Sequence, residues 1–159
     1  MGPQPTARSP SASATIPWLW RFLLLNVEPL CTIGGFLTLT FAPTVYTSSM
    51  TRHTLTTIDP ASGFIYTQLV GGWLHFAFIE GVVLRFVDDY RVWRLSCLGM
   101  LVSDAFFLHS CAQAIGGWGV WLQVGGWSAD DWAVTVSTLP FVLARVLIVS
   151  GIGLRRKVE

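Results

Sequence analysis

Residues 132–154 read WAVTVSTLPFVLARVLIVSGIGL, an apolar run in which Arg145 is the one charged side chain. A bilayer core about 30 Å thick is crossed by about 20 helical residues, so this run is long enough to span a membrane. Three further runs meet the same condition, at about 17–41, 64–86 and 95–114. The sequence therefore predicts an all-α protein, an integral membrane four-helix bundle.

The composition of the 159-residue chain supports this class. Hydrophobic residues make up 52% and charged residues only 12%, whereas a soluble domain carries about 25% charged residues. The net charge of +1 comes without a basic patch, which argues against nucleic acid as a partner. The sequence has no HExxH and no Glu-x-x-His at helical spacing, so we expect no metal site. Its three cysteines form no CxxC pair and each lies in an apolar run, as small buried side chains do.

The helical domain is predicted over residues 17–154. Residues 1–16 are rich in Pro, Ser and Ala, which predicts a disordered N-terminal lead. Residues 155–159 form a basic tail. The loops 42–63 and 115–131 are polar or rich in Gly and Trp, and lie on the side of the membrane opposite to both termini.

The distribution of Lys and Arg predicts the orientation. The loop side carries only Arg52, and Arg145 is intramembrane. The remaining eight of the ten lie on the side of the termini, namely Arg8, Arg21, Arg85, Arg91, Arg94, Arg155, Arg156 and Lys157. By the positive-inside rule both termini, including the tail, are expected to be cytosolic. We expect a multi-pass protein of the endoplasmic reticulum.

Each predicted span also contains one charged residue away from its ends: Glu28, Glu80, Asp104 and Arg145. At 1.5 Å per residue these four lie roughly 9–15 Å from the cytosolic end of their helices. A charge at this depth must face the bundle interior and find a partner, so the four are predicted to converge. Three acids and one arginine cannot all be ionised there, so at least one acid is expected to be protonated at neutral pH.

A carboxylate beside a neutral carboxylic acid is a general base beside a general acid. We therefore assign Asp104 as the base that activates water or a substrate hydroxyl, and Glu80 as the acid. Arg145 holds and orients the ionised acid. Glu28 is a third acid, and Glu28 followed by Pro29 also suits a residue at a broken helix. The alternative for the whole cluster is that these residues only hold the helices together.

Candidate substrate contacts are Gln68, Trp73, His75 and His109. Gln68 and His75 are seven residues apart and share one helix face, so they would extend a polar lining toward the lumenal side. Each histidine has an alternative interpretation as a packed, hydrogen-bonded side chain. Proline in a membrane helix predicts a kink whose freed carbonyls are satisfied by neighbouring helices, and this applies to Pro29 in the first run and Pro140 in the fourth.

Five short motifs follow one another along the spans: WLWRF at 18–22, Glu28-Pro29, FIEGVVLRF at 78–86, RVWR at 91–94 and Asp104-x-x-Phe107. In these motifs and their order, about residues 17–156 of the chain resemble a fungal family of small four-span membrane proteins, known mainly as a domain of unknown function. The His-rich continuation that members often carry after the aspartate is missing here, apart from His109. Some members resemble the membrane-bound epoxide hydrolases of aurovertin-type and citreoviridin-type polyketide pathways. The resemblance implies opening of polyketide epoxides and formation of oxygen heterocycles. A more distant likeness, of layout alone, is to four-span sterol isomerases and sigma-receptor-like proteins.

The function expected from the acids and the resemblance is that of a membrane enzyme of fungal secondary metabolism. It would open an epoxide on an apolar polyketide, by hydrolysis or by cyclisation, and acid–base chemistry needs no cofactor. Its partners would be the apolar substrate, membrane lipid and other enzymes of the pathway. Two alternatives stay open: a terpene or meroterpenoid cyclase that uses the same acids, and a non-enzymatic protein that binds lipid or sterol or scaffolds other enzymes.

Overall fold

The computed structural model describes residues 9–155, which form helices and turns and no β-strand. Four helical segments are long and apolar enough to cross a membrane, at Trp18–Phe41, Pro60–Phe86, Tyr90–Ala114 and Ala129–Ser150. The predicted all-α fold with four membrane-spanning helices is therefore confirmed.

Two of the four segments contain π-helical turns. The first comprises α2 (Trp18–Phe22), the π-helical η1 (Leu23–Val27) and α3 (Glu28–Phe41). The second comprises the 3₁₀-helical η2 (Pro60–Ser62), α5 (Gly63–Phe78), the π-helical η3 (Ile79–Val83) and α6 (Leu84–Phe86). The third is α7 (Tyr90–Ala114), and the fourth comprises α9 (Ala129–Val136) and α10 (Leu139–Ser150). Outside these segments lie α1 (Ala12–Thr15), α4 (Pro43–Met50), α8 (Trp118–Trp121) and η4 (Val124–Gly126).

Capping explains where the helices depart from the predicted bounds. The third begins at Tyr90 rather than near residue 95, because the Asp89 carboxylate accepts the backbone N–H groups of Arg91 at 2.7 Å and Val92 at 3.1 Å. The fourth ends at Ser150 rather than at 154, because the chain turns at Gly151 with φ of 75°. Glycine enters this left-handed conformation without a steric penalty.

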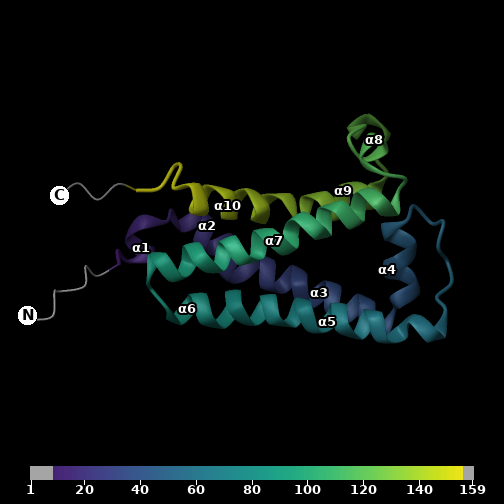
Figure 1. Cartoon of the computed structure of the whole chain (residues 1–159), viewed down its shortest axis with the longest axis horizontal. Coiled ribbons are helices and arrows are strands. Elements are labelled where there is room, and N and C mark those ends of the chain that lie inside the picture. The colour runs from purple at the N-terminus through teal and green to yellow at the C-terminus, as the bar shows by residue number, and fades with distance from the viewer. Residues whose placement is uncertain (1–8, 156–159) are drawn as a thin grey trace, which may run out of the picture.

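The four helices pack as two pairs, α3 with α5 and α7 with α10. Both described ends of the chain lie at one end of the bundle, where the Arg155 N–H donates to the Thr15 carbonyl at 2.9 Å. Figure 1 shows that the pairs diverge toward the opposite end, where α4 lies across the space between them. We call these the terminal end and the α4 end.

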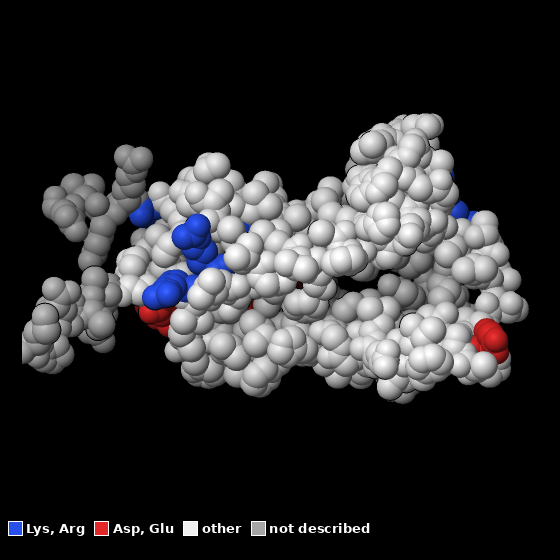
Figure 2. Space-filling model, in the orientation of Figure 1, with Lys and Arg blue, Asp and Glu red and all other residues white. Residues whose placement is uncertain are grey.

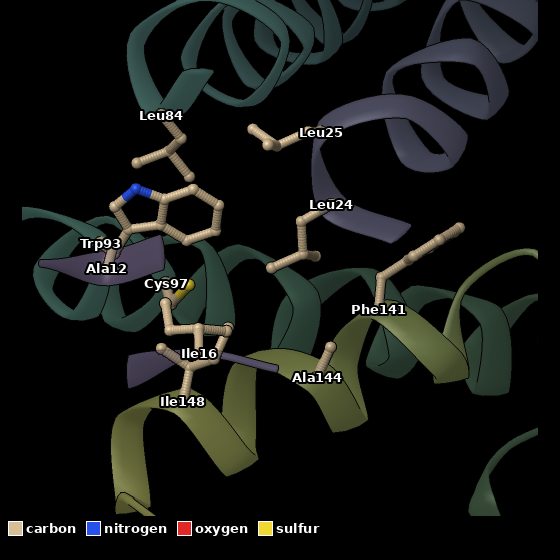
Figure 3. Close-up of a cluster of buried hydrophobic side chains, with 10 residues drawn as sticks. All are labelled: Ala12, Ile16, Leu24, Leu25, Leu84, Trp93, Cys97, Phe141, Ala144 and Ile148. Carbon is tan, nitrogen blue, oxygen red and sulfur yellow. The ribbon is translucent and has the colours of Figure 1, made fainter. Parts of the chain in front are cut away.

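A cluster of buried apolar side chains joins the two pairs at the terminal end (Figure 3). Its members are Ala12, Ile16, Leu24, Leu25, Leu84, Trp93, Cys97, Phe141, Ala144 and Ile148. Trp93 is 1% exposed, and its indole Nε1–H donates to the Val87 carbonyl at 2.9 Å. Because its N–H is hydrogen-bonded, the buried tryptophan adds a large apolar contact without leaving a polar group unpaired. This core fixes the terminal end, so any space between the pairs lies farther along.

The outside of the spans is apolar, as lipid contact requires. Large side chains such as Leu30, Phe41, Phe86 and Phe106 are 70–80% exposed. On the face drawn in Figure 2, charged side chains gather near the two ends and leave the middle uncharged. A soluble monomer rarely exposes so much contiguous apolar surface, so this surface supports a multi-pass membrane protein.

The predicted disorder of residues 1–16 is corrected for the described part. Residues 1–8 lie outside the described residues, as do 156–159 of the tail. Residues 9–16 fold against the bundle and include α1, where Ala12 and Ile16 are fully buried in the terminal core. The prediction of disorder rests on composition alone, and the segment orders because two of its few apolar side chains find this core.

Asp88, in the turn between α6 and α7, holds α1 in place. Its carboxylate accepts hydrogen bonds from Ser11 Oγ at 2.6 Å, Ser13 N–H at 2.7 Å and Ser13 Oγ at 2.8 Å. These hydrogen bonds lower the pKa of Asp88 below its ordinary value, and the bond from the Ser11 hydroxyl contributes most, followed by the bond from the Ser13 backbone N–H. Since the folded pKa is lowered, this contact is fully present above the ordinary carboxyl range and is lost as pH falls through the lowered pKa.

Asp88→Asn is therefore expected to release α1. In detergent micelles at neutral pH, proteinase K should cleave residues 9–16 several-fold faster in this variant than in the parent, because the charged acceptor of three hydrogen bonds is gone. Asp59→Asn makes the same chemical change at the α4 end and should leave the cleavage rate unchanged. Equal rates for Asp88→Asn and the parent would show that the apolar contacts alone hold α1.

Candidate functional site

Arg145 on α10 contacts one acid from each of the other three spans. Its Nη1 lies 2.6 Å from Asp104 Oδ2, and its Nη2 lies 2.6 Å from both Glu28 Oε1 and Glu80 Oε1. Arg145 is 2% exposed and Glu80 is fully buried. The structure thus brings together all four charged residues that the depth estimate placed at a common level.

The π-helical turns lie where two of these acids enter the cluster. The Glu28 N–H donates to the carbonyl of Leu23, five residues back, and Glu80 lies inside η3. A π-turn accommodates one extra residue and so shifts the direction in which the following side chains point. Such turns are rare in helices overall, and those that occur are often at functional sites. The turns η1 and η3 also contact each other. They set the directions from which the two glutamates approach Arg145.

Pro29 explains part of this geometry. Proline has no N–H, so it leaves a carbonyl one turn earlier without its helical donor. The Leu25 carbonyl accepts a hydrogen bond from Arg85 Nη2 of the second span at 2.5 Å. This contact agrees with the prediction for Pro29, whereas Pro140 lies in the first turn of α10 and does not kink a continuous helix.

The cluster cannot hold three ionised carboxylates, because one guanidinium would leave two negative charges uncompensated in the bundle interior. Glu28 and Glu80 each present one carboxyl oxygen to the same nitrogen of Arg145, at 2.6 Å. Two carboxyl groups that face the same nitrogen repel each other when both are ionised, which favours a proton on one of them. We therefore treat Glu28 and Glu80 as a pair that shares one proton, and Asp104 as the ionised partner of Arg145 Nη1.

A cavity of about 210 Å³ extends from the cluster toward the α4 end. Glu28, Asp104 and Arg145 border it, whereas Glu80 does not. The rest of its wall is mostly apolar or aromatic and comprises Cys31, Thr32, Gly35, Tyr46, Met50, Trp73, Phe76, Ser103, Phe107, Val134, Ser137 and Thr138. The cavity is thus apolar with one charged end, as sites for small apolar ligands are.

Three buried polar atoms of the cluster have no hydrogen-bond partner among the described residues: Glu28 Oε2, Glu80 Oε2 and Arg145 Nε. Leaving a buried polar atom unpaired costs about 1–3 kcal/mol. Glu28 and Arg145 border the cavity and Glu80 does not, so Glu28 Oε2 and Arg145 Nε are the unpaired atoms nearest to a polar group of a ligand. Within residues 9–155, no group of three His, Cys, Asp or Glu side chains is arranged to hold a metal ion.

Of the four predicted substrate contacts, only Trp73 borders the cavity. Gln68 and His75 share a face of α5 as predicted, but they lie roughly 140–160° around the helix from Trp73 and are exposed on the outside of the bundle. His109 is also exposed, and its Nδ1 accepts a hydrogen bond from Trp118 Nε1 at 3.0 Å. The spacing that grouped Gln68 with His75 could not indicate which face points inward.

Tyr46 and Met50 on α4 were missed, because the sequence predicts a loop over residues 42–63. The Tyr46 ring packs edge-on against Trp73, with centroids 5.4 Å apart. Burial raises the pKa of the Tyr46 hydroxyl, so it stays protonated at neutral pH. Pro43 at the first position of α4 is a signal that could have indicated the helix.

Gly35 makes room for Trp73 at the cavity wall. A Cβ at Gly35 would lie 3.3 Å from the Trp73 ring, whereas a Cβ at the neighbouring Gly34 would meet nothing within 4 Å. Gly34→Ala is expected to stabilise the helix by about 0.5–1 kcal/mol. Gly35→Ala should instead destabilise by about 1 kcal/mol, because Trp73 must move. Thermal unfolding in detergent compares the two, and equal shifts would contradict this packing.

The family described as "Domain of unknown function (DUF7704)" matches residues 13–155. The chain belongs to this family. The match includes all four spans and the whole Arg145 cluster. The description names neither an organism nor an activity, so the family supports the resemblance only at this coarser level. No curated protein and no solved structure matches the chain.

Proposed function

We propose that this DUF7704 protein is a membrane enzyme that opens an epoxide on an apolar small molecule by general acid–base catalysis. The observation that carries the proposal is an apolar cavity with two carboxyl groups at one end, Glu28 and Asp104, both in contact with Arg145 at 2.6 Å. Epoxide opening needs a proton on the leaving oxygen and a base for the attacking group, and no cofactor. The more specific proposal, that the substrate is a fungal polyketide, rests on the family resemblance alone.

In the proposed mechanism Asp104 is the general base. It accepts a proton from water as the water oxygen bonds to an epoxide carbon and the C–O bond of that carbon breaks. Glu28 donates the proton that it shares with Glu80 to the departing epoxide oxygen. The product is a diol, or a cyclic ether where a hydroxyl of the substrate attacks instead of water. Transfer of a proton from Asp104 to the glutamate pair then restores the site.

The acid is assigned differently from the sequence-based hypothesis, which gave this role to Glu80. Glu80 is fully buried and does not border the cavity, so it has no direct path to a substrate. Glu28 borders the cavity and has the unpaired Oε2. Glu80 becomes a positioning residue that holds the shared proton beside Glu28.

The test measures turnover of three apolar epoxides by the purified protein in detergent micelles made up in ¹⁸O-labelled water. The probes are methyl 9,10-epoxystearate, an epoxyfarnesol and a polyene epoxide. Hydrolysis predicts a diol that carries one ¹⁸O atom, formed by the parent protein and not by Asp104→Asn. If the parent converts none of the three faster than Asp104→Asn does, epoxide opening is rejected.

The aromatic wall favours a second candidate, a terpene or meroterpenoid cyclase. Trp73, Phe76 and Phe107 border the cavity, and aromatic faces stabilise cations. In that reaction Glu28 would protonate an epoxide or alkene, and the ring would close on the resulting cation without solvent oxygen. A cyclic product that lacks ¹⁸O would favour this candidate. Saturable binding of the probes without any product would favour a lipid- or sterol-binding protein instead.

We also propose an orientation with both termini in the cytosol of an endoplasmic reticulum membrane, beside other enzymes of the same pathway. The terminal end carries Arg21, Arg85, Arg91, Arg94 and Arg155, whereas Arg52 lies at the α4 end. A glycosylation acceptor inserted after residue 56 should be glycosylated in microsomes, and one appended to the C-terminus should not. The reverse pattern would invert the orientation.

A further inference from the structure

We infer that the cavity is entered sideways from the lipid, between the two helix pairs, and that its ligand is a long-chain amphipath. The ligand's oxygen function would reach the Arg145 cluster while its chain stays in the bilayer. The chemistry of that oxygen function rests on the proposed function, whereas the route of entry does not. We infer the route of entry from which sides of the cavity are closed by protein and which side is open.

The terminal end of the cavity is closed by protein. Beyond Arg145 lies the terminal core, in which Leu24, Ala144 and Ile148 are fully buried. The side chains of Figure 3 come from both helix pairs and from α1, and they fill the space between these elements. Water from this end would have to pass through close-packed apolar side chains.

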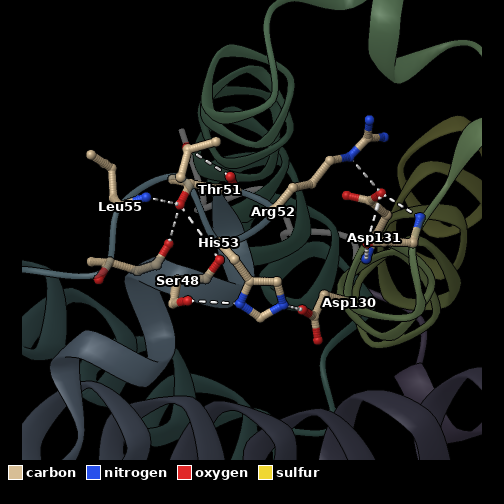
Figure 4. Close-up of polar contacts among 10 residues, drawn as sticks. Ser48, Thr51, Arg52, His53, Leu55, Asp130 and Asp131 are labelled. Carbon is tan, nitrogen blue, oxygen red and sulfur yellow. Dashed lines mark hydrogen bonds and ion pairs between the residues drawn. The ribbon is translucent and has the colours of Figure 1, made fainter.

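The α4 end is closed by α4, which is fastened to α9 by polar contacts (Figure 4). Arg52 Nε lies 2.9 Å from Asp131 Oδ2, and His53 Nε2 lies 3.2 Å from Asp130 Oδ2. The Asp131 carboxylate also accepts the Ser128 N–H at 2.7 Å as part of the α9 capping box. It is thereby fixed on α9, so the contact with Arg52 holds the end of α4 at a defined place.

The backbone is strained at Arg52 and His53, the two residues that contact α9, which indicates that this turn has a specific role in holding α4. Arg52 and His53 both have positive φ, at 49° and 62°. Two successive residues that are not glycine are uncommon in the left-handed region, and such conformations persist only where the surroundings hold them. Here they direct both side chains from the end of α4 toward α9. The contacts that hold this turn are those that keep α4 across the cavity.

The long side of the cavity is open. Figure 2 shows a hollow between the α7–α9 side and the α5 side of the bundle, next to α4. The wall residues Cys31 on α3 and Ser137 between α9 and α10 are exposed, and Phe76 on α5 and Phe107 on α7 are half-buried, so the cavity reaches the surface between the two helix pairs. The outer surfaces of the same helices are apolar, with Leu69 and Val102 exposed. In a membrane this opening meets hydrocarbon rather than water.

Cys31 is a natural reporter of access, because it borders the cavity and is exposed at its opening, against the expectation of a buried side chain, whereas Cys97 and Cys111 are buried. The full chain, with Cys97→Ala and Cys111→Ala, is placed in phosphatidylcholine vesicles permeable to small solutes. It is treated with a disulfonated stilbene maleimide, which stays in water, or with pyrenyl maleimide, which enters the bilayer. Each rate is normalised to that of a Thr56→Cys variant lacking Cys31, whose thiol lies on the exposed segment after α4.

Lipid entry predicts that pyrenyl maleimide labels Cys31 at least tenfold faster than the charged reagent after normalisation. Comparable rates would overturn the inference, and so would failure of both reagents to label Cys31 while Thr56→Cys reacts. A double Arg52→Ala and His53→Ala variant should admit the charged reagent at least fivefold faster. Arg91→Ala, an exposed arginine at the terminal end, is the matched control and should leave that rate unchanged.

The labelling experiment tests the route of entry and the turnover experiment tests the chemistry, so either proposal can be rejected without the other. If Cys31 is labelled from the lipid but no epoxide is converted, the proposed function is rejected and the route of entry stands. If epoxides are converted but the charged reagent labels Cys31 as fast as the apolar one, the chemistry stands and the route is rejected.

Discussion

Arg145→Met is expected to destabilise the bundle by about 3–5 kcal/mol, the usual cost of removing one partner from a buried ion pair. Arg145 is 2% exposed and contacts Glu28, Glu80 and Asp104 at 2.6 Å each. Without it the remaining negative charges repel one another in a medium that cannot solvate them. Thermal unfolding in detergent, followed by helical circular dichroism, should show a large fall in midpoint.

A variant that combines Arg145→Met with Glu28→Gln, Glu80→Gln and Asp104→Asn distinguishes the loss of charge compensation from the loss of side-chain packing. It holds no charge at the cluster, and a well-packed neutral replacement of a buried ion network is often neutral or stabilising. It should therefore recover most of the lost stability. Arg145→Lys keeps the charge but not the two-pronged contact, so it should fall between the parent and Arg145→Met. If the multiple variant is as unstable as Arg145→Met alone, the loss comes from packing and the electrostatic account is wrong.

The meeting of the four charged residues was predictable because membrane depth constrains it. A charge far from the interface must face protein, and positions along apolar helices convert to depth at 1.5 Å per residue. Glu80, Asp104 and Arg145 were therefore placed together without knowledge of how the helices pack. The same reasoning could not rank Glu28 above Glu80, because it fixes depth and not which carboxyl borders the cavity.

The cavity itself depends on features that periodicity does not contain. The turns η1 and η3 arise within apolar runs that look like uninterrupted helix, and they shift the side chains after them. The helix α4 is eight residues of mixed polarity, too short and too polar to stand out from a loop. Its position depends on Arg52 and His53, whose partners Asp130 and Asp131 lie far along the chain.

Asp104→Asn is expected to lower turnover of a converted epoxide by at least about 100-fold, the lower range for loss of a positioned general base. The amide keeps an acceptor for Arg145 Nη1, so the unfolding free energy should stay within about 1 kcal/mol of the parent. Glu28→Gln should cause a comparable loss, because its amide cannot donate the shared proton to a leaving oxygen.

Glu80→Gln separates the cavity-facing acid from the buried one, since it removes a carboxyl that has no face on the cavity. Its loss of turnover should be clearly smaller than that of Glu28→Gln. Asp59→Asn, the same change outside the cavity, controls for expression and handling. A larger loss for Glu80→Gln than for Glu28→Gln would return the role of acid to Glu80. Full turnover by Asp104→Asn, with labelled oxygen still entering the product, would remove Asp104 from the mechanism.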